Sequence, residues 1–179
     1  MYRLLRLVAF ASSLTLVSAF AGPALAGDTR HASAMFVDAS GTPIGWARLV
    51  EDATGRVHVN IHVQGLAPGL HGIHIHAVGS CSPTFAAAGG HYNPLGQQHG
   101  LDNPNGPHAG DLPNLEVSDE GVGHLDATTD RVTLSAGPAT LFDATGSAFI
   151  IHANPDDQVT DAGNGGSGAR IACAVIESE

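Results

Sequence analysis

Short runs of alternating apolar and polar residues recur along the chain, separated by Gly, Pro, Asp and Asn at intervals of roughly ten residues. The clearest run is Val57–Gln64, in which Val or Ile occupies every second position and polar residues lie between. Because successive side chains of a strand point to opposite faces, such a run has one buried and one solvated face. No convincing helical period accompanies these runs. The pattern predicts an all-β antiparallel sandwich or barrel.

Two long segments without periodicity, Val78–Gly110 and Asn154–Gly168, interrupt the predicted strands. A connection as long as the first is unusual in a compact domain and indicates either function or disorder. Five of the eleven histidines lie between residues 74 and 108, which favours function. In outline we expect eight short strands and two long functional loops. Nine runs are candidates for these strands: Ala32–Val37, Ile44–Glu51, Val57–Gln64, Gly72–Ala77, Asp111–Val117, Gly123–Ala127, Arg131–Leu134, Ala148–Ala153 and Ala169–Ile176.

Residues 1–26 have the pattern of a cleaved export signal. Arg3 and Arg6 precede the apolar stretch Leu7–Phe20, and Ala24–Ala26 supplies a cleavage site of small residues. A transmembrane anchor is the competing interpretation, but the apolar stretch is short for a membrane span and is followed by a Gly-Pro pair. We expect export to the periplasm or the exterior, cleavage after Ala26, and one domain at residues 27–179 with no membrane span.

The composition of the chain disfavours some classes of binding partner and bears on the oxidation state of its cysteines. The formal charge of −10 becomes −12 once the two signal arginines are removed, and the chain has no lysine, which disfavours nucleic acid and anionic membranes as partners. In an exported chain the two cysteines, Cys81 and Cys173, are expected to form a disulfide, with free buried thiols as the alternative. Closing so long a loop removes roughly 4–5 kcal/mol of unfolded-state entropy in the chain-entropy model.

The segment Gly69–His76 holds three histidines, and two of them, His74 and His76, are two residues apart. On a strand these two imidazoles lie on the same face, while Ile73 and Ile75 face the other side. Imidazole and carboxylate donors suit zinc, and imidazoles alone suit copper or zinc. The long loop supplies further donors of both kinds: His91, His99, His108 and Asp111.

Several segments, in this order, resemble the copper/zinc superoxide dismutase family and its exported bacterial members: Gly69–His76, Cys81, Gly89–Pro94, Gly106–Leu112, Ile151–His152 and Gly168–Cys173. The similarity extends over Ala32–Ile176. It implies an eight-stranded Greek-key barrel or sandwich, in agreement with the strand pattern. It also implies an oxidoreductase that disproportionates superoxide to O₂ and H₂O₂ by cycling copper between Cu(II) and Cu(I).

The resemblance implies a role for each matching residue. Copper would be held by His74, His76, His91 and His152, and zinc by His91, His99, His108 and Asp111, with His91 shared as an imidazolate that can also carry a proton. Arg170 would guide the anion, and Cys81–Cys173 would be the family disulfide. Asp156, or Asp157 as the neighbouring alternative, would hydrogen-bond one copper and one zinc histidine. His71 would be structural.

Other interpretations stay open. A relative that binds the metals without turnover is disfavoured because all six histidines, Asp111 and Arg170 are present; a sandwich that binds no metal is more remote. Many family members guide superoxide with lysines in the loop before the arginine. Here the loop Asn154–Ala169 has three aspartates and no basic residue, which puts long-range steering of superoxide in doubt. Monomer and homodimer are both compatible with the sequence. His31, His58 and His62 are expected to be exposed or to bind metal incidentally, and His124 is expected to be solvated.

Overall fold

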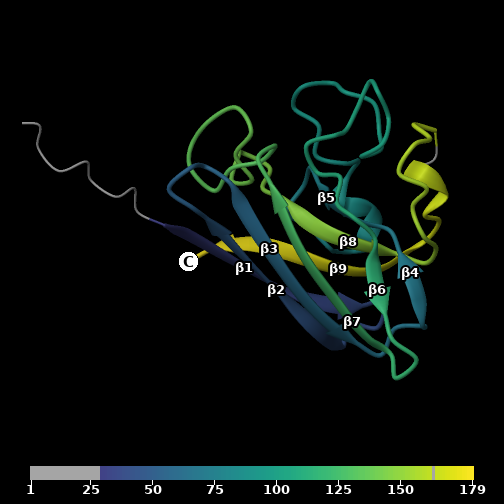
Figure 1. The fold of residues 1–179 in the computed structure, drawn as a ribbon. Coiled ribbons are helices and arrows are strands. Elements are labelled where there is room, and N and C mark those ends of the chain that lie inside the picture. The colour runs from purple at the N-terminus through teal and green to yellow at the C-terminus, as the bar shows by residue number, and fades with distance from the viewer. Residues whose placement is uncertain (1–28, 163) are drawn as a thin grey trace, which may run out of the picture.

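Nine antiparallel strands form one sheet that curls into a nearly closed barrel (Figure 1). The computed structural model describes residues 29–162 and 164–179, so the predicted export signal at residues 1–26 lies outside the described residues. The sheet order is β4-β6-β7-β3-β2-β1-β9-β8-β5. The all-β antiparallel prediction is confirmed, with nine strands in place of eight. The elements are β1 (Arg30–Asp38), β2 (Pro43–Glu51), β3 (Val57–Gln64), β4 (Gly69–His71), β5 (Ile73–His76), the 3-10 helix η1 (Phe85–Ala88), β6 (Leu115–Val117), β7 (Val122–Thr129), β8 (Ala148–His152), the 3-10 helix η2 (Asn164–Gly166) and β9 (Arg170–Ser178).

One continuous segment, Gly69–His76, supplies both ends of the sheet. Its first half, β4, pairs with β6, and its second half, β5, pairs with β8. Between the halves, Gly72 donates its N–H to the carbonyl of Asn154 and accepts a hydrogen bond from the N–H of His152. The chain thus changes its pairing partner at Gly72. The strand predicted at Gly72–Ala77 is β5, and β4, which precedes it, is the strand that the sequence pattern did not predict.

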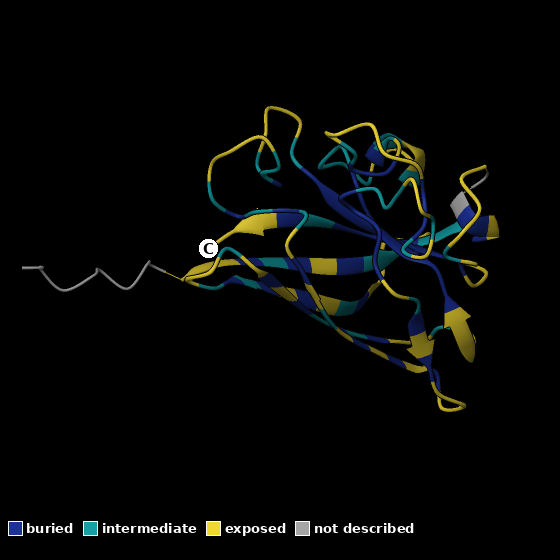
Figure 2. Ribbon diagram, turned by 45° about the horizontal axis from the view of Figure 1, so that its top comes forward, coloured by how far each residue is buried: buried dark blue, intermediate teal, exposed yellow. Residues whose placement is uncertain are grey.

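The core lies inside the barrel and follows the predicted alternation. The four apolar residues of β3 are 0–1% exposed, and buried and exposed positions alternate along β1, β2 and β3 (Figure 2). In β5 and β8 every residue is buried, on both faces. Their inner faces contribute Ile73, Ile75, Phe149 and Ile151 to the core. The outer face of β5 carries the predicted metal-binding histidines, so a polar side of the strand is shielded from solvent.

Two predicted strands differ from the structure. The run Asp111–Val117 is a strand only at Leu115–Val117, because Pro113 has no N–H to contribute to a ladder. The prediction of a strand at Arg131–Leu134 is wrong: these residues lie in the 130–147 loop, where only Thr133 makes an isolated bridge, to Thr140.

The carboxylate of Glu51 accepts main-chain hydrogen bonds from this loop that a neighbouring strand would otherwise accept. It accepts hydrogen bonds from the N–H groups of Leu134 and Ser135 at 2.7 and 2.6 Å and from the Ser135 hydroxyl at 2.7 Å. Glu51 is only 7% exposed. Burial alone would raise its pKa, but these hydrogen bonds hold the pKa below the ordinary value of 4.5. An ionised carboxylate therefore fixes the start of the 130–147 loop.

The predicted disulfide between Cys81 and Cys173 is present, and it ties the long loop to β9 with a Cα–Cα distance of 5.9 Å. Cys173 is buried in a small apolar cluster with Ala88, Ala148 and Ile150, against which Phe85 packs. The bond therefore anchors η1 against the outer side of β8 and β9. No helix among the described residues is long and apolar enough to span a membrane.

We expect Glu51→Gln to lower the free energy of unfolding by about 1–3 kcal/mol, because buried N–H groups lose a charged acceptor. The Glu51 contribution is complete above its ordinary pKa of 4.5 and is lost as the pH falls through the lower folded-state pKa. The variant should therefore lose less stability than the wild type between about pH 5 and pH 3. Urea denaturation at each pH measures this, with the exposed Glu177→Gln as control; equal pH slopes for Glu51→Gln and the wild type would contradict it.

Candidate metal centre

The outer face of β5 and the loop that covers it bring four imidazoles together. His74 and His76 project from β5, and His152 ends β8, where the pairing with β9 shifts register after Ile151. His91 comes from the long loop and forms a backbone bridge with His76. One ligand nitrogen from each of the four rings lies within 4.8 Å of the others. Sequence positions up to 78 residues apart thus meet because β5 pairs with β8 and the loop bridges the free edge of β5.

Three of these rings have one nitrogen fixed by an acceptor oxygen. His76 Nδ1 donates to the carbonyl of Gly89 at 2.9 Å, His152 Nδ1 donates to the carbonyl of Gly168 at 3.0 Å, and His74 Nε2 donates to Asp156 at 2.6 Å. These contacts set the tautomer and leave the other nitrogen of each ring as a lone-pair donor.

The remaining nitrogens of the four rings are buried and have no hydrogen-bond partner: His74 Nδ1, His76 Nε2, His91 Nε2 and His152 Nε2. A buried polar atom without a partner is costly and rare. Four that converge are explained by a cation that accepts all four lone pairs, and an all-imidazole set suits copper. The donor set therefore fits the copper that the sequence predicts.

Burial keeps these rings neutral and ready to bind a metal. The pKa of His74 is lowered to about 3 and that of His76 to about 2; burial is the largest cause, and the neighbouring imidazoles contribute to both shifts. Burial also lowers the pKa of His91 and of His152. A nitrogen must be unprotonated to bind a metal. Because the pKa values of these rings are low, none of the four has to lose a proton at neutral pH to offer its free nitrogen.

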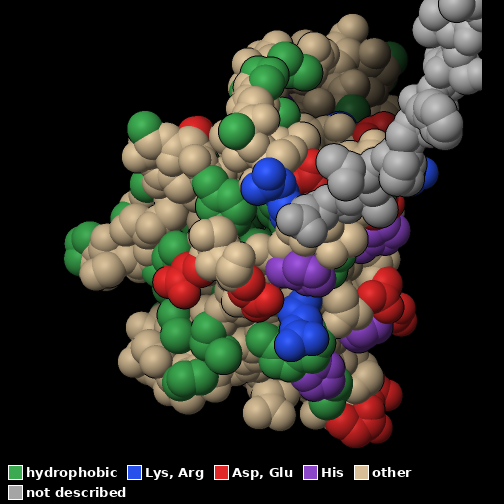
Figure 3. Space-filling model, turned by 90° about the vertical axis from the view of Figure 1, so that its left-hand side faces the viewer, with side chains coloured by type: hydrophobic (Ala, Val, Ile, Leu, Met, Phe, Trp, Pro, Cys, Tyr) green, Lys and Arg blue, Asp and Glu red, His purple; other side chains and the backbone are tan. Residues whose placement is uncertain are grey.

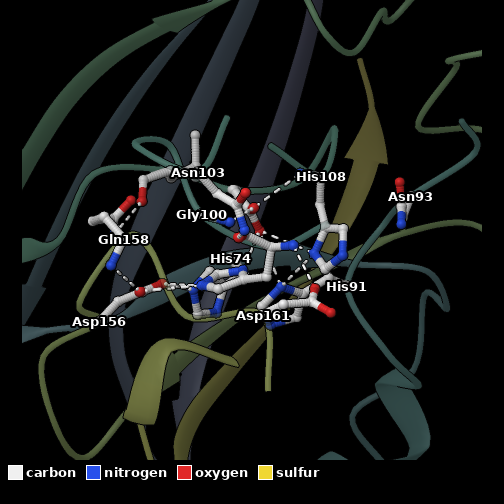
Figure 4. A network of polar contacts seen from close by, with 12 residues as sticks. His74, His91, Asn93, Gly100, Asn103, His108, Asp156, Gln158 and Asp161 are labelled. Carbon is white, nitrogen blue, oxygen red and sulfur yellow. Dashed lines mark hydrogen bonds and ion pairs between the residues drawn. The ribbon is translucent and has the colours of Figure 1, made fainter. Parts of the chain in front are cut away.

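A second donor set surrounds Asp111; two of its imidazoles, His91 and His108, are labelled in Figure 4. Asp111 Oδ1 lies 3.0 Å from His91 Nδ1, 3.0 Å from His99 Nδ1 and 3.4 Å from His108 Nδ1, and the Nδ1 atoms of His91 and His108 are 3.2 Å apart. The edge of a tetrahedron with 2.0 Å bonds to its centre is about 3.3 Å, so these separations match the ligand cage of zinc. Asp111 Oδ2 points away and accepts from the N–H groups of Gly100 and His108, both at 2.9 Å.

Another grouping of donors within 4.8 Å contains His74 in place of His108, together with His91, His99 and Asp111. His74 is less suited to this set because Asp156 holds its Nε2 and its Nδ1 belongs to the imidazole set. In either grouping His91 contributes to both sets, since its Nδ1 faces Asp111 and its Nε2 faces the imidazole set.

Backbone geometry explains why Asp111 arrives at this place. It forms an isolated bridge with His74, and Gly110 accepts a hydrogen bond from the N–H of Ile75. A Cβ on Gly110 would lie 2.3 Å from the carbonyl oxygen of Ile75, so only glycine permits this approach. The glycine before Asp111 thus lets the loop lie directly against β5.

Asp156 joins the two donor sets from the other side. Its carboxylate contacts His74 Nε2 at 2.6 Å and His99 Nε2 at 3.0 Å. Asp157, the alternative considered from the sequence, is exposed and caps the N–H groups of Val159 and Thr160 instead. Burial opposes ionisation of Asp156, but its hydrogen bonds from His74 and His99 hold its pKa below the usual range.

His99 is held between two carboxylates, and its charge depends on them. Burial lowers its pKa, but hydrogen bonds to Asp111 and Asp156 outweigh burial and raise the pKa to about 9. Without a metal the ring is therefore protonated at neutral pH. Binding a metal at Nδ1 of His99 would release a proton.

Arg170 is attached to the same framework. Its guanidinium donates to the carbonyls of Phe85 and Gly89, both at 2.6 Å. The Gly89 carbonyl also accepts from His76 Nδ1, so one oxygen orients both Arg170 and His76. Because η1 packs on the disulfide, Cys81–Cys173 supports this contact.

Sequence reasoning missed Asn114, Gly165 and Arg131. The Asn114 side chain donates to the carbonyl of Asp156 and accepts from its N–H, both at 2.8 Å. A Cβ on Gly165 would lie 1.9 Å from Asp156 Oδ1. Arg131 donates to the carbonyl of Asp111 at 2.7 Å. No local pattern marks these residues, because each acts through a segment distant in sequence.

The other histidines lie outside both donor sets. His71 makes two backbone contacts, with the carbonyls of His152 and Ala67 at 2.7 and 2.8 Å. His58 and His124 are exposed and pair with Asp52 and Asp126, His62 stacks on Trp46, and His31 contacts Thr29. Exposed histidines beside acidic side chains are visible in Figure 3.

Comparisons with known proteins agree with this geometry. The family model of copper/zinc superoxide dismutase (SODC) matches residues 44–176. Superoxide dismutase [Cu-Zn] 2 of Aquifex aeolicus is 43% identical over 170 residues, which cover 93% of this chain and 95% of the relative. The superoxide dismutase-like protein YojM of Bacillus subtilis is 41% identical over 143 residues, covering 78% of this chain and 72% of the relative.

A solved structure is also similar. The crystal structure of a SOD-like protein from Bacillus subtilis superposes with a TM-score of 0.75 at 39% identity, covering 80% of this chain and 96% of that chain. The fold is therefore shared with this solved structure.

Replacing Asp156 by asparagine should weaken the binding of both metals by about 10–100-fold, because one carboxylate orients a ring in each donor set. Competition with chelators, measured separately for copper and zinc, tests this. Asp157→Asn, which removes the same charge one residue away, should leave both affinities unchanged. Affinities of Asp156→Asn within twofold of the wild type would show that the ring orientation does not depend on this carboxylate.

Proposed function

The chain belongs to the copper/zinc superoxide dismutase family, an oxidoreductase family, and from this premise we propose that it disproportionates superoxide to O₂ and H₂O₂ outside the cytoplasm. In this proposal residues 1–26 direct export and are removed, and residues 27–179 form the mature enzyme in the periplasm or beyond it. The disulfide supports this placement, because such bonds persist in oxidising compartments.

The observation that carries the proposal is the set of four buried, unpaired imidazole nitrogens. His74 Nδ1 and the Nε2 atoms of His76, His91 and His152 would hold copper. His91, His99 and His108, each through Nδ1, would hold zinc together with Asp111 Oδ1. Copper, when bound, supplies the one-electron cycle between Cu(II) and Cu(I) by which one superoxide is oxidised and the next is reduced.

His91 is the residue suited to carry a proton to the product. Its Nδ1 belongs to the set around Asp111, so its position is fixed while its Nε2 faces the imidazole set. When no metal occupies Nε2, this nitrogen can therefore take up a proton and return it without movement of the backbone. A cation held at Nδ1 would make the Nε2 proton of this ring more acidic, which would favour its transfer to a basic peroxide oxygen.

Arg170 would attract and orient the superoxide anion. Two carbonyls hold its guanidinium rigidly, and the charge is near enough to lower the pKa of His76 and of His152, after the larger effect of burial. The loop before it carries acidic residues and, among those described, no basic residue. Attraction is therefore local to Arg170 rather than spread over the loop.

The alternative is a protein that binds these metals without turnover, as a superoxide dismutase-like name leaves open for the Bacillus subtilis relative. Both complete donor sets and Arg170 favour the enzyme. The two functions make opposite predictions for the metal-loaded chain.

A superoxide-disproportionation assay on the copper- and zinc-loaded mature chain decides between them. We expect activity that disappears on selective copper removal and returns on copper addition. His76→Ala should abolish activity while zinc remains bound, because His76 belongs only to the imidazole set. A fully copper-loaded wild type without activity would disprove the enzymatic proposal, and unchanged copper occupancy in His76→Ala would disprove the ligand assignment.

Arg170→Met should lower the rate constant with superoxide by about tenfold or more at low salt, since the local attraction is lost. The difference from the wild type should shrink as salt screens the charge. Stopped-flow decay of superoxide measures both, and the copper EPR spectrum verifies that His76 stays in place. The exposed Arg48→Met is the matched control; an equal loss of rate in that variant would show that net charge, rather than Arg170, governs the encounter.

A further inference from the structure

Arg131 reaches the metal centre from behind Asp111. Its Nη2 donates to the Asp111 carbonyl at 2.7 Å, and the guanidinium is half-buried. Asp111 and Asp130 are the carboxylates that attract its charge. The guanidinium thus contacts the main chain of Asp111, and the side chain of Asp111 is the centre of the second donor set.

Arg131 is itself held in place. Its N–H donates to the hydroxyl of Thr129, which is 2% exposed at the end of β7. A few residues on, the Glu51 carboxylate fixes the N–H groups of Leu134 and Ser135. The guanidinium therefore extends from a firmly anchored stretch of backbone.

Arg131 completes the fixation of Asp111. The side-chain oxygen Oδ2 is held by the N–H groups of Gly100 and His108, and the Asp111 N–H donates to the carbonyl of His108. These three contacts all come from the long loop, residues 78–110. Arg131 supplies the contact from outside this loop to the Asp111 carbonyl.

Burial of the guanidinium needs an explanation, because charged groups are costly to bury unless they are paired. Its Nε is buried without a hydrogen-bond partner, and burial lowers the pKa of the side chain. A surface charge with no further role would be better solvated. A role of the Arg131–Asp111 hydrogen bond beyond packing accounts for the buried position of the guanidinium.

We propose that Arg131 is a positioning residue for zinc: it fixes the main chain of Asp111 so that Oδ1 already faces His91, His99 and His108 before the metal binds. This rests on the zinc ligand set proposed above. The positive charge of Arg131 also opposes a nearby dication. Positioning outweighs this repulsion, so removal of Arg131 weakens zinc binding rather than strengthening it.

The test is zinc affinity in the full mature chain, measured by competition with a chromophoric chelator. Arg131→Met keeps an unbranched apolar stem and removes the charge and the donors; we expect zinc to bind about 10–100-fold more weakly. Arg131→Lys keeps a charge and one donor and should recover part of this loss. Arg48→Met, on the outer face of β2, removes a charge without touching the site and should bind zinc as the wild type does.

Cobalt placed in the zinc site gives a second measurement that general destabilisation does not change. In a folded Arg131→Met chain, the visible spectrum of Co²⁺ should differ from that of the wild type because Asp111 Oδ1 is displaced. Unchanged or tighter zinc binding, or an unchanged Co²⁺ spectrum, would overturn the positioning role. Failure of the wild type itself to bind zinc, or normal zinc binding by Asp111→Asn, would instead refute the underlying ligand set.

Discussion

The metal centre depends on one constraint, the burial of both faces of β5. The inner face contributes isoleucines to the core, and the outer face presents two imidazoles that cannot remain buried without partners. The long loop and the segment after β8 satisfy them by bringing carbonyls, carboxylates and further imidazoles to that face. The loop is irregular because it follows positions set by these donors rather than a ladder of its own.

Two carboxylates give this centre its rigidity. Asp111 gathers three imidazoles with one oxygen and binds main-chain N–H groups with the other, and Asp156 connects a ring from each donor set. Each carboxylate is in turn fixed by residues outside the histidine motifs, Arg131 for Asp111 and Asn114 for Asp156. The positions of the donors are thus determined by groups that never touch a metal.

The sequence predicts the parts of this structure that follow a local period or a familiar motif. The alternation in β3 and the disulfide are present as expected, and His74 and His76 share one face of β5 opposite Ile73 and Ile75. The failures involve partners distant in sequence. The run at Arg131–Leu134 looks like a strand, but its N–H groups meet the side chain of Glu51 rather than another strand. Likewise, no local signal shows that the strand at Gly72 changes partner or that Asn114 reaches Asp156.

The bridges that place His91 and Asp111 have a further consequence for how copies of this chain meet. β5 ends the sheet order, and an unpaired edge of this kind is a template on which a strand of another molecule can add. Here the edge is occupied by the chain itself: Asp111 bridges His74, His91 bridges His76, and the N–H of Tyr92 donates to the carbonyl of Ile75. The residues that assemble the metal centre therefore also block strand pairing between molecules at the β5 edge. A change that loosens them would expose the main-chain N–H and C=O groups of β5 as well as the binding site.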